Sequence, residues 1–422
     1  MTLKHSIAPI FSACVFYVLP QLSVASGFAV FVQGASALGE GLASTAHGNN
    51  PQVVFFNPAL LGQLDGTQIE GGVTLLAPSN DFHSEFDNSS DKTDDAVFYP
   101  ATFYLTHKYS DKLSLGFGIF SPFGLGTKWD DDWEGRYIVT EAEMQSLNFN
   151  PVVAYQVTPT ISLAAGLDVL YVDTTLENRL NFSTLGFPDG HQELSGDGTG
   201  YGFNLALYTP LTDDLSFGLT YRSEINVDLK GKVKFRLPSP SLNPSFPQSS
   251  IEASVDFPAQ LHAAFAYSGF DRSVVEIGLR WEGWSSYDEL RVDSSQPING
   301  MTTSSRPTDW NDTLTLTLGG RYELNAKTRL LAGFVRGQDP IPGKTFEPSV
   351  TDSPNYAITL GSEHSLGRHN LAFAYAYQKW FDRTKDNDIG AQFSGGTVPD
   401  ARANGEYQSH THFFAISFTY VF

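Results

Sequence analysis

The stretch YSDKLSLGFGIF, residues 109–120, places a tight polar turn directly before a run in which large apolar residues alternate with serine and glycine. Alternation with a period of two is typical of a β-strand that has two different faces. A long polar segment, residues 122–144, follows at once. Turn, alternating strand and long loop form a unit that recurs along the chain.

Six short turns of this kind occur, at residues 109–112, 158–160, 211–214, 269–272, 325–328 and 365–368. Seven long segments rich in Asp, Ser, Gly and Pro lie around them, at residues 83–96, 122–144, 184–199, 238–250, 293–309, 338–353 and 382–403. Short turns on one rim and long loops on the other are typical of outer-membrane β-barrels. Seven loops and six turns predict an all-β barrel of fourteen antiparallel strands.

The alternation also predicts which face of each strand meets the lipid. Leu314, Leu316 and Leu318 alternate with threonines, and the final strand carries on one face Phe414, Ile416, Phe418, Tyr420 and Phe422. In a barrel such apolar side chains face outward, and the small or polar ones face the lumen. A soluble β-sandwich is the alternative, but it would not give the two rims different loop lengths.

The composition fits one large barrel better than a helical membrane protein. The chain has 422 residues, of which 41% are apolar, and a mean hydropathy of -0.18. A helix that spans a membrane needs about 18 or more consecutive uncharged apolar residues, and past the N-terminus the sequence has no such run. The same length would suggest two or three soluble domains, but a large barrel uses it as one domain.

Residues 1–25 have the features of a secretory signal peptide. Lys4 precedes an apolar stretch, and Ser23-Val24-Ala25 supplies small residues for cleavage after Ala25. A lipoprotein signal that uses Cys14 is the alternative, but the apolar region before that residue is short. Because Cys14 is the only cysteine, we expect no disulfide in the mature protein.

The chain is acidic, with a formal net charge of -20 that becomes -21 when Lys4 is removed. This balance disfavours nucleic acid as a partner and disfavours charge-driven binding to anionic membranes. Acidic residues gather in expected loops, as in residues 91–95 and 130–134. They are either solvated loop tips or, through divalent cations, contacts to lipopolysaccharide phosphates in the outer leaflet.

The segment of residues 26–66 does not follow the pattern of the wall. It is rich in glycine and alanine, lacks strand alternation and contains Asn57-Pro58-Ala59. The apolar run at residues 53–56 needs burial, which argues against a disordered periplasmic extension. We therefore expect three regions: a signal peptide at 1–25, a plug inside the lumen at 26–66, and the barrel at 67–422.

Several motifs resemble those of the FadL family of outer-membrane transporters for long-chain fatty acids and other hydrophobic compounds. The most specific is Leu-Thr-Tyr-Arg-Ser-Glu at residues 219–224, and Asn57-Pro58-Ala59 comes next. Weaker blocks lie at residues 26–28, 121–127, 201–204 and 340–342. The resemblance covers almost all of the expected mature chain. It implies a monomeric fourteen-stranded barrel with an N-terminal plug, or hatch, in the outer membrane of a Gram-negative bacterium.

The resemblance also implies a passive route for a hydrophobic ligand. In the family, extracellular loops capture the ligand, an apolar pocket holds it, and a gap at an inward kink of the third strand releases it sideways. The corresponding kink here comprises Pro122, Phe123, Gly124, Leu125 and Gly126. Proline and glycine interrupt a strand ladder, although Pro122 alone could simply mark the end of the strand.

Loop capture and hatch gating complete the implied route. The capture residues are expected to be Trp129, Trp133, Leu185 and Phe187. Exposed apolar loop residues need something to bind or to pack against, and packing of the loops on one another is the alternative. The triplet Asn57, Pro58 and Ala59 is expected beneath the pocket, where a small shift of the hatch would open the exit.

One departure from the family concerns the carboxylate of a fatty acid. Family members can hold it with a basic residue directly after a glutamate of the fifth strand, but here Glu177 is followed by Asn178, and Arg179 comes one residue later. An offset of one residue turns a strand side chain to the opposite face. Either the register shifts and Arg179 is the anchor, or the pocket lacks this anchor and favours neutral hydrocarbons, aromatics or esters.

Other functions have less support in the sequence. An outer-membrane hydrolase would need a Ser/His pair, and no Gly-x-Ser-x-Gly motif is present. His410 and His412 lack a third metal ligand nearby, so we expect neither a metal nor a cofactor. A general diffusion porin needs an open polar lumen without a plug. The terminal Phe422 resembles the signal that the barrel-assembly machinery recognises.

Overall fold

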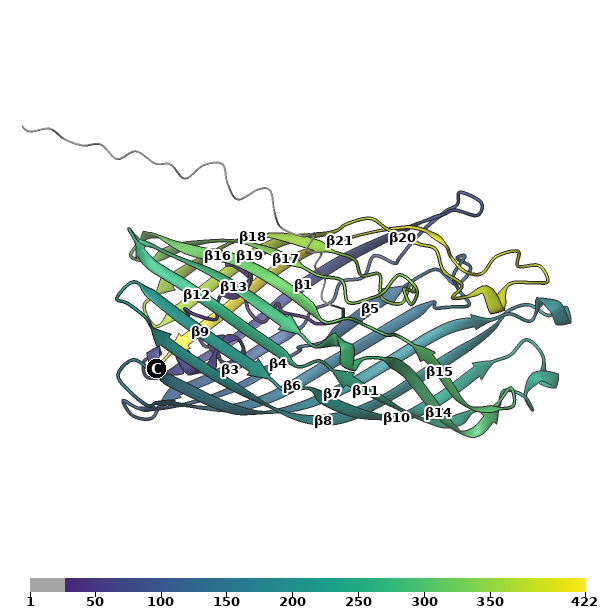
Figure 1. Cartoon of the computed structure of the whole chain (residues 1–422), viewed down its shortest axis with the longest axis horizontal. Coiled ribbons are helices and arrows are strands. Elements are labelled where there is room, and N and C mark those ends of the chain that lie inside the picture. The colour runs from purple at the N-terminus through teal and green to yellow at the C-terminus, as the bar shows by residue number, and fades with distance from the viewer. Residues whose placement is uncertain (1–26) are drawn as a thin grey trace, which may run out of the picture.

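The structure, a computed structural model, describes residues 27–422. The expected signal peptide, including Cys14, lies outside the described residues. The strands form one closed antiparallel barrel, with short turns at one end and long loops at the other (Figure 1). β1 closes the barrel by pairing with β21 on one side and with β3 on the other.

The strands are β1 (Thr67–Ser84), β2 (Ser90–Lys92), β3 (Ala101–Lys108), β4 (Leu113–Phe120), β5 (Gly124–Lys128), β6 (Glu141–Gln156), β7 (Ser162–Leu180), β8 (Gly190–Pro210), β9 (Leu215–Arg222), β10 (Ile225–Arg236), β11 (Ser249–Phe257), β12 (Gln260–Phe270), β13 (Ser273–Glu282), β14 (Glu289–Ile298), β15 (Met301–Pro307), β16 (Thr313–Asn325), β17 (Thr328–Gly337), β18 (Asn355–Leu366), β19 (His369–Trp380), β20 (Arg383–Lys385) and β21 (Gly405–Val421). The helices are α1 (Ala35–Gly39), α2 (Val53–Phe56), η1 (Pro58–Gln63), η2 (Ser183–Leu185), η3 (Pro240–Leu242), η4 (Trp284–Ser286) and η5 (Ala391–Phe393). Among the helices of residues 27–422, none is both long and apolar enough to cross a membrane.

Fourteen strands form the wall, as the sequence predicts. Five of them are interrupted and appear as two elements each, namely β4/β5, β10/β9, β11/β12, β13/β14 and β15/β16, whereas β2 and β20 belong to loops. The six predicted turns join β3 to β4, β6 to β7, β8 to β9, β12 to β13, β16 to β17 and β18 to β19. The count of turns and loops therefore gave the correct strand number.

Strands extend into six of the seven predicted loops, and furthest into two of them. β8 begins at Gly190, inside the segment 184–199, and β14 and β15 form a hairpin through the segment 293–309. Polar residues there still pair across the ladder, as in the ion pair of Lys234 and Glu193, whose charged atoms are 2.6 Å apart. Strands with polar faces can thus continue beyond the apolar band, where cross-strand pairs stabilise them.

The two faces of the wall follow the predicted alternation. Thr315 of β16 is fully buried toward the lumen, whereas its neighbour Leu314 is 39% exposed on the outside. Phe414 and Phe418 of β21 are likewise exposed, and Ala415 and Ser417 between them are buried. The exposed apolar side chains form the surface that meets lipid.

The N-terminal segment, residues 27–66, lies inside the barrel, which is consistent with the expected plug (Figure 1). Its backbone approaches the wall so closely that only glycine fits at several contacts. A Cβ added to Gly333 of β17 would lie 2.5 Å from Cα of Gly41, and one added to Gly319 of β16 would lie 2.6 Å from the carbonyl carbon of Glu40. The small residues of both surfaces therefore permit close packing of plug and wall.

Glu70 of β1 joins the plug to both ends of the wall. Nε2 of Gln52 in the plug donates to Oε1 of Glu70 at 2.7 Å, and Oγ1 of Thr419 in β21 donates to Oε2 at 3.0 Å. The β1–β21 ladder runs from Gln68 opposite Val421 to Ser84 opposite Gly405. Plug, first strand and last strand thus meet at one buried carboxyl group.

Candidate functional site

The third strand of the wall bends inward between β4 and β5. In the described structure β5 pairs with β6 alone, and its other edge has no ladder partner. The backbone at this break pairs with the plug instead. The N–H of Val30 donates to the carbonyl of Pro122 at 2.8 Å, and the N–H of Gly124 donates to the carbonyl of Phe28 at 2.9 Å. The strand is therefore interrupted between Phe120 and Gly124, and this break docks onto the plug; a lateral opening at residues 122–126 stays a prediction.

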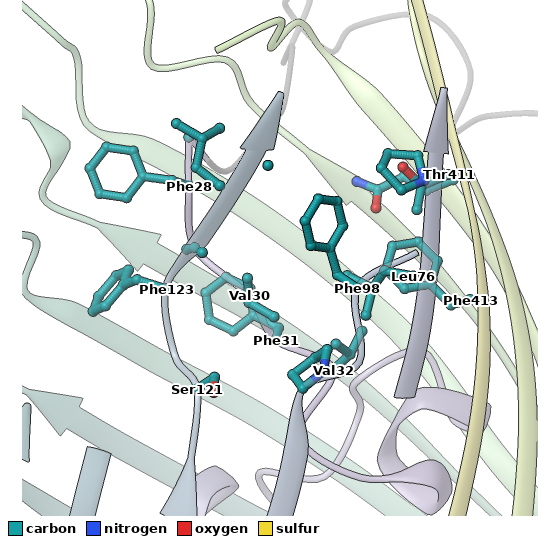
Figure 2. A pocket seen from close by; sticks show the side chains of 18 of the residues that line it. Phe28, Val30, Phe31, Val32, Leu76, Phe98, Ser121, Phe123, Thr411 and Phe413 are labelled. Carbon is teal, nitrogen blue, oxygen red and sulfur yellow. The ribbon is translucent and has the colours of Figure 1, made fainter. Parts of the chain in front are cut away.

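A cavity of about 960 Å³, the kink cavity, lies between this break, the plug and the opposite wall. The plug and β1 supply its apolar side, with Phe28, Val30, Phe31, Val32 and Leu76 (Figure 2). The wall from β13 to β21 supplies its polar side, with Arg280, Thr315, Asn355, Gln378 and Thr411. A ligand in this cavity would meet an apolar surface on one side and hydrogen-bonding groups on the other.

A second, smaller cavity of about 110 Å³, the loop cavity, lies toward the extracellular end. Apolar side chains dominate its lining: Leu125, Met144, Leu176, Leu194, Leu229, Ile251, Val255 and Ile341. Residues 345–350 of the long loop after β17 contribute to its lining as well. The kink cavity and the loop cavity therefore differ in polarity.

Phe28 of the plug lies between the two cavities and lines both, as do Leu125, Met144 and Val350. Its ring makes edge contacts with Trp284 at 4.6 Å and Phe257 at 5.8 Å between centroids, and it lies 5.3 Å from Trp310. Gly27 precedes it with φ of +57°, a conformation that favours glycine. The start of the plug is thus held in an aromatic cluster between the cavities.

Arg280 is the basic residue that lines the kink cavity, and Asp352 is an acidic one on the same side. Its guanidinium carbon lies 3.2 Å from the ring centroid of Phe31, and its Nη2 donates to Oγ1 of Thr315 at 3.2 Å. Asn355 is also buried there, and its Nδ2 has no hydrogen-bond partner within the described structure. An unpaired buried donor costs free energy, so an oxygen atom of a ligand would stabilise it.

Asp352 supports the plug at the same cavity. The N–H of Gly27 donates to its Oδ2 at 2.7 Å, and Nε1 of Trp380 donates to its Oδ1 at 2.8 Å. Burial, followed by the nearby Asp339, raises the pKa of Asp352 well above its usual range. The backbone carbonyl of Asp352 also accepts from Arg383, so this loop is fixed against the start of the plug.

His47 joins the opposite end of the plug to the wall. Its Nε2 lies 2.5 Å from Oε2 of Glu40, and its Nδ1 lies 2.9 Å from Oε2 of Glu276 in β13. Burial alone would lower the pKa of His47, but the two carboxylates outweigh burial and raise it to about 9. Glu276 also accepts the backbone N–H groups of residues 45–47.

The triplet Asn57, Pro58 and Ala59 is buried in the plug and does not line either cavity. Nδ2 of Asn57 donates to the carbonyls of Thr45 at 2.6 Å and Leu207 at 3.1 Å, and its Oδ1 accepts from the N–H of Ala59 at 3.0 Å. Asn57 thus connects two parts of the plug to β8. Its position is compatible with a role in holding the hatch.

The predicted capture residues divide into two groups. Trp129 and Trp133 are buried and stacked, with centroids 4.3 Å apart, and they line neither cavity. The alternative that the loops pack on one another therefore describes these two residues. Leu185 is 61% exposed and Phe187 is half-buried, so both remain accessible on the third loop.

Arg179 does not reach the kink cavity. It lies outside both cavity linings and forms an ion pair with Asp131 of the preceding loop. The β6–β7 and β7–β8 ladders keep one register through Glu177, so no shift turns Arg179 inward. Of the two alternatives for the carboxylate, the structure favours a pocket without this anchor.

Sequence reasoning missed the residues that the fold brings together from distant strands. Phe28, Arg280 and Asn355 come from the plug, β13 and β18, and no local motif connects them. The inward orientation of Arg280 could have been read from the alternation of β13, because a charged inward residue in an apolar strand is unusual. Its proximity to Phe28 and Asn355 could not have been predicted from the sequence.

Comparisons with known proteins agree with this architecture. The profile of the family described as "Outer membrane protein transport protein (OMPP1/FadL/TodX)" matches residues 16–422. The chain is 22% identical over 431 residues to the long-chain fatty acid transport protein of Escherichia coli O6:H1, covering 92% of each chain. It is 22% identical over 447 residues to a putative outer membrane protein of Neisseria meningitidis serogroup B, covering 94% of this chain and 95% of that protein.

Solved structures have the same fold. A Pseudomonas aeruginosa FadL homologue superposes with a TM-score of 0.81 at 20% identity, covering 94% of this chain and 99% of that one. The Pseudomonas putida toluene transporter TodX superposes with a TM-score of 0.72 at 18% identity, covering 92% and 98%. The profile match covers nearly the whole chain. This chain belongs to the OMPP1/FadL/TodX family of outer-membrane transport proteins.

Proposed function

We propose that this chain is a passive channel that takes up long-chain fatty acids or other hydrophobic compounds through the outer membrane. The observation that carries the proposal is the kink cavity, whose lining extends from Phe31 in the lumen to Gln145 and Tyr171 on the outer face of the wall. Each methylene of a ligand gains about 0.8 kcal/mol when it leaves water for an apolar site. A path that leads from apolar cavities into lipid suits such ligands.

The route begins at the exposed loop residues Leu185 and Phe187 and enters the loop cavity. Phe28 then separates the ligand from the kink cavity, and the break at residues 122–126 leads sideways into the bilayer. Asn57, with Pro58 and Ala59, holds the plug beneath this path.

The names of the relatives give two cargo classes, a fatty acid and an aromatic hydrocarbon. We propose that an amphiphile is preferred, because Arg280 and the unpaired Nδ2 of Asn355 supply donors for a carboxylate on one side of the kink cavity. The competing argument is that Glu282 lies 3.4 Å from Arg280 and balances its charge. Neutral hydrocarbons therefore remain the second candidate.

Competition binding separates these candidates. A fluorescent long-chain fatty acid is titrated into the purified barrel and displaced by unlabelled fatty acid or by toluene. Displacement by the acid alone, with weakened binding in Arg280→Met but not in Arg179→Met, supports a carboxylate site at Arg280. Equal displacement by toluene supports a hydrocarbon channel. If neither ligand binds and reconstituted protein conducts ions well above background, the chain is a general porin.

We also infer that the C-terminal strand is recognised during assembly. Phe422 is 60% exposed, and its N–H donates to the carbonyl of Thr67 at 2.9 Å, next to the β1–β21 closure. The barrel-assembly machinery would bind this aromatic end before closure. Deletion of Phe422 should lower the yield of folded barrel in cells, and a normal yield would remove the inference.

A further inference from the structure

A window interrupts the wall beside the kink. On the periplasmic side, β3 and β4 pair as far as Phe103 and Ile119. On the extracellular side, the backbone of Thr93 bridges to Trp129, and the N–H of Asp94 donates to the carbonyl of Lys128 at 2.8 Å. Between these closures, residues 95–101 face residues 121–127 without ladder pairing in the described structure. Paired backbone therefore frames the window on two sides.

The ring of Phe98 fills the middle of this window. A Cβ added to Gly126 on the opposite rim would lie 2.7 Å from Cε2 of Phe98 and closer still to two further ring atoms. The absence of a side chain at Gly126 thus creates the seat in which the ring lies. Figure 2 shows Phe98 projecting into the cavity between the plug and Leu76.

The backbone of Phe98 is fixed while its ring has room to move. Phe98 and Leu76 exchange two backbone hydrogen bonds, of 2.9 and 2.8 Å, which hold the rim to β1. The neighbours Val97 and Tyr99 are 54% and 73% exposed and line the outer mouth of the kink cavity, whereas Phe98 is half-buried between them. The kink cavity, of about 960 Å³, lies next to the ring and can accept another rotamer.

We propose that Phe98, seated on Gly126, is the exit gate that controls release of ligand from the kink cavity into the bilayer. The inference rests on the proposed uptake function and adds the residue that sets its last step. With the ring on its seat, the window is occupied by an aromatic side chain. Rotation of the ring away from Gly126 clears a path between apolar rims, and the ligand's chain replaces the ring in contact with Gly126.

The test separates binding from release. Phe98→Cys and Gly126→Cys are combined in a Cys14→Ser background and joined by a short, reducible thiol crosslinker. Phe98→Ala removes the ring, and Tyr109→Ala, which removes an exposed aromatic ring from the β3–β4 turn outside both cavity linings, is the control. For each protein, binding of fluorescent fatty acid to the purified barrel and uptake rate in cells are measured. Resistance of the barrel to SDS without heating confirms that each variant is folded.

The gate predicts opposite effects on uptake with little change in binding. Phe98→Ala should raise the uptake rate severalfold, the crosslink should lower it severalfold, and reductant should restore it, while Tyr109→Ala matches the wild type. An unchanged uptake rate in the crosslinked or in the Phe98→Ala protein, with binding intact, overturns the gate. Absence of fatty-acid binding in the wild-type barrel overturns the proposed function instead.

Discussion

Asn57 shows how much of the plug depends on one side chain. A buried amide can make several hydrogen bonds, and each one left unmade costs more than a surface bond contributes. Asn57 uses two donors and one acceptor to join residues 45, 59 and 207, which belong to three segments. The side chain therefore fixes the plug to β8 as well as beginning η1.

Replacing Asn57 should loosen the plug. Asn57→Ala loses all three hydrogen bonds, and we expect a loss of about 1–3 kcal/mol in the free energy of unfolding. Asn57→Asp keeps the acceptor for Ala59 but places a carboxylate against two carbonyls, so it should be at least as destabilising. Guanidinium unfolding of the purified barrel measures both. Wild-type stability of Asn57→Asp would show that the two donors contribute nothing.

His47 gives the plug a pH dependence. Because its folded pKa of about 9 lies above the ordinary 6.5, the protonated form is stabilised in the native protein. This stabilisation is complete below the pKa of the unfolded chain and is lost as the pH rises through 9. The unfolding midpoint of the wild type should therefore exceed that of His47→Gln at pH 6, and the difference should shrink by pH 10. A difference that stays constant over this range would contradict the assignment.

At the scale of elements, the plug and the wall contact each other through backbone. α1 runs into residues 40 and 41, which lie against Gly319 and Gly333 of neighbouring strands. A side chain added at Gly319 or Gly333 would clash with the plug backbone, so either the plug or the strand would have to shift. The separation of plug and wall is thus set by the absence of side chains on both partners.

Gly333→Val should displace the plug from β17. Overpacking of this kind typically costs about 1–3 kcal/mol, and displacement would open a path for ions beside the plug. We expect higher single-channel conductance in planar bilayers than for the wild type. Gly71→Val is the matched control, because a side chain at that strand position meets open space. Equal conductance of the two variants would argue against this contact.

The strands could be predicted from the sequence, and their interruptions could not. The alternation of Leu314 with Thr315 is a local signal that survives in the fold, and the turns are equally local. At the break between β13 and β14, Trp284 packs on Phe28, and this contact spans more than two hundred residues, so no local pattern shows it. The kink at residues 122–126 was predictable only because proline and glycine mark it.

For the candidate site, too, local motifs could be predicted from the sequence and contacts between distant segments could not. Pro122 and Gly126 were found because they lie in one motif, whereas Phe98 lies on the opposite rim of the window. Trp129 and Trp133 have the composition of a capture surface, but the stacked pair is buried by loops that the sequence does not bring together. The sequence shows that these loop residues are aromatic, but their burial depends on how the loops pack in the folded protein.

At the scale of the molecule, Phe28 is the aromatic residue of the plug that lies between the kink cavity and the loop cavity. Phe28→Ala should merge them, because the ring contacts both linings, and it should also weaken docking of the plug by about 3–5 kcal/mol. A fluorescent fatty acid bound to the barrel should then dissociate severalfold faster in stopped-flow displacement. Phe86→Ala, at an exposed loop position, is the control. An unchanged dissociation rate would show that the ring is no barrier.

The meeting of plug, first strand and last strand at Glu70 constrains the order of assembly. Thr419 and Glu70 are 349 residues apart along the chain, so the earliest strand to be exported must wait for the latest. Contacts of such sequence separation form slowly and leave an open strand edge in the meantime. Gln52 binds the same carboxyl group, so the plug is fixed to the wall at the seam where the barrel closes. A chain that ends before β21 therefore lacks the strand that pairs with β1, so it cannot close this barrel.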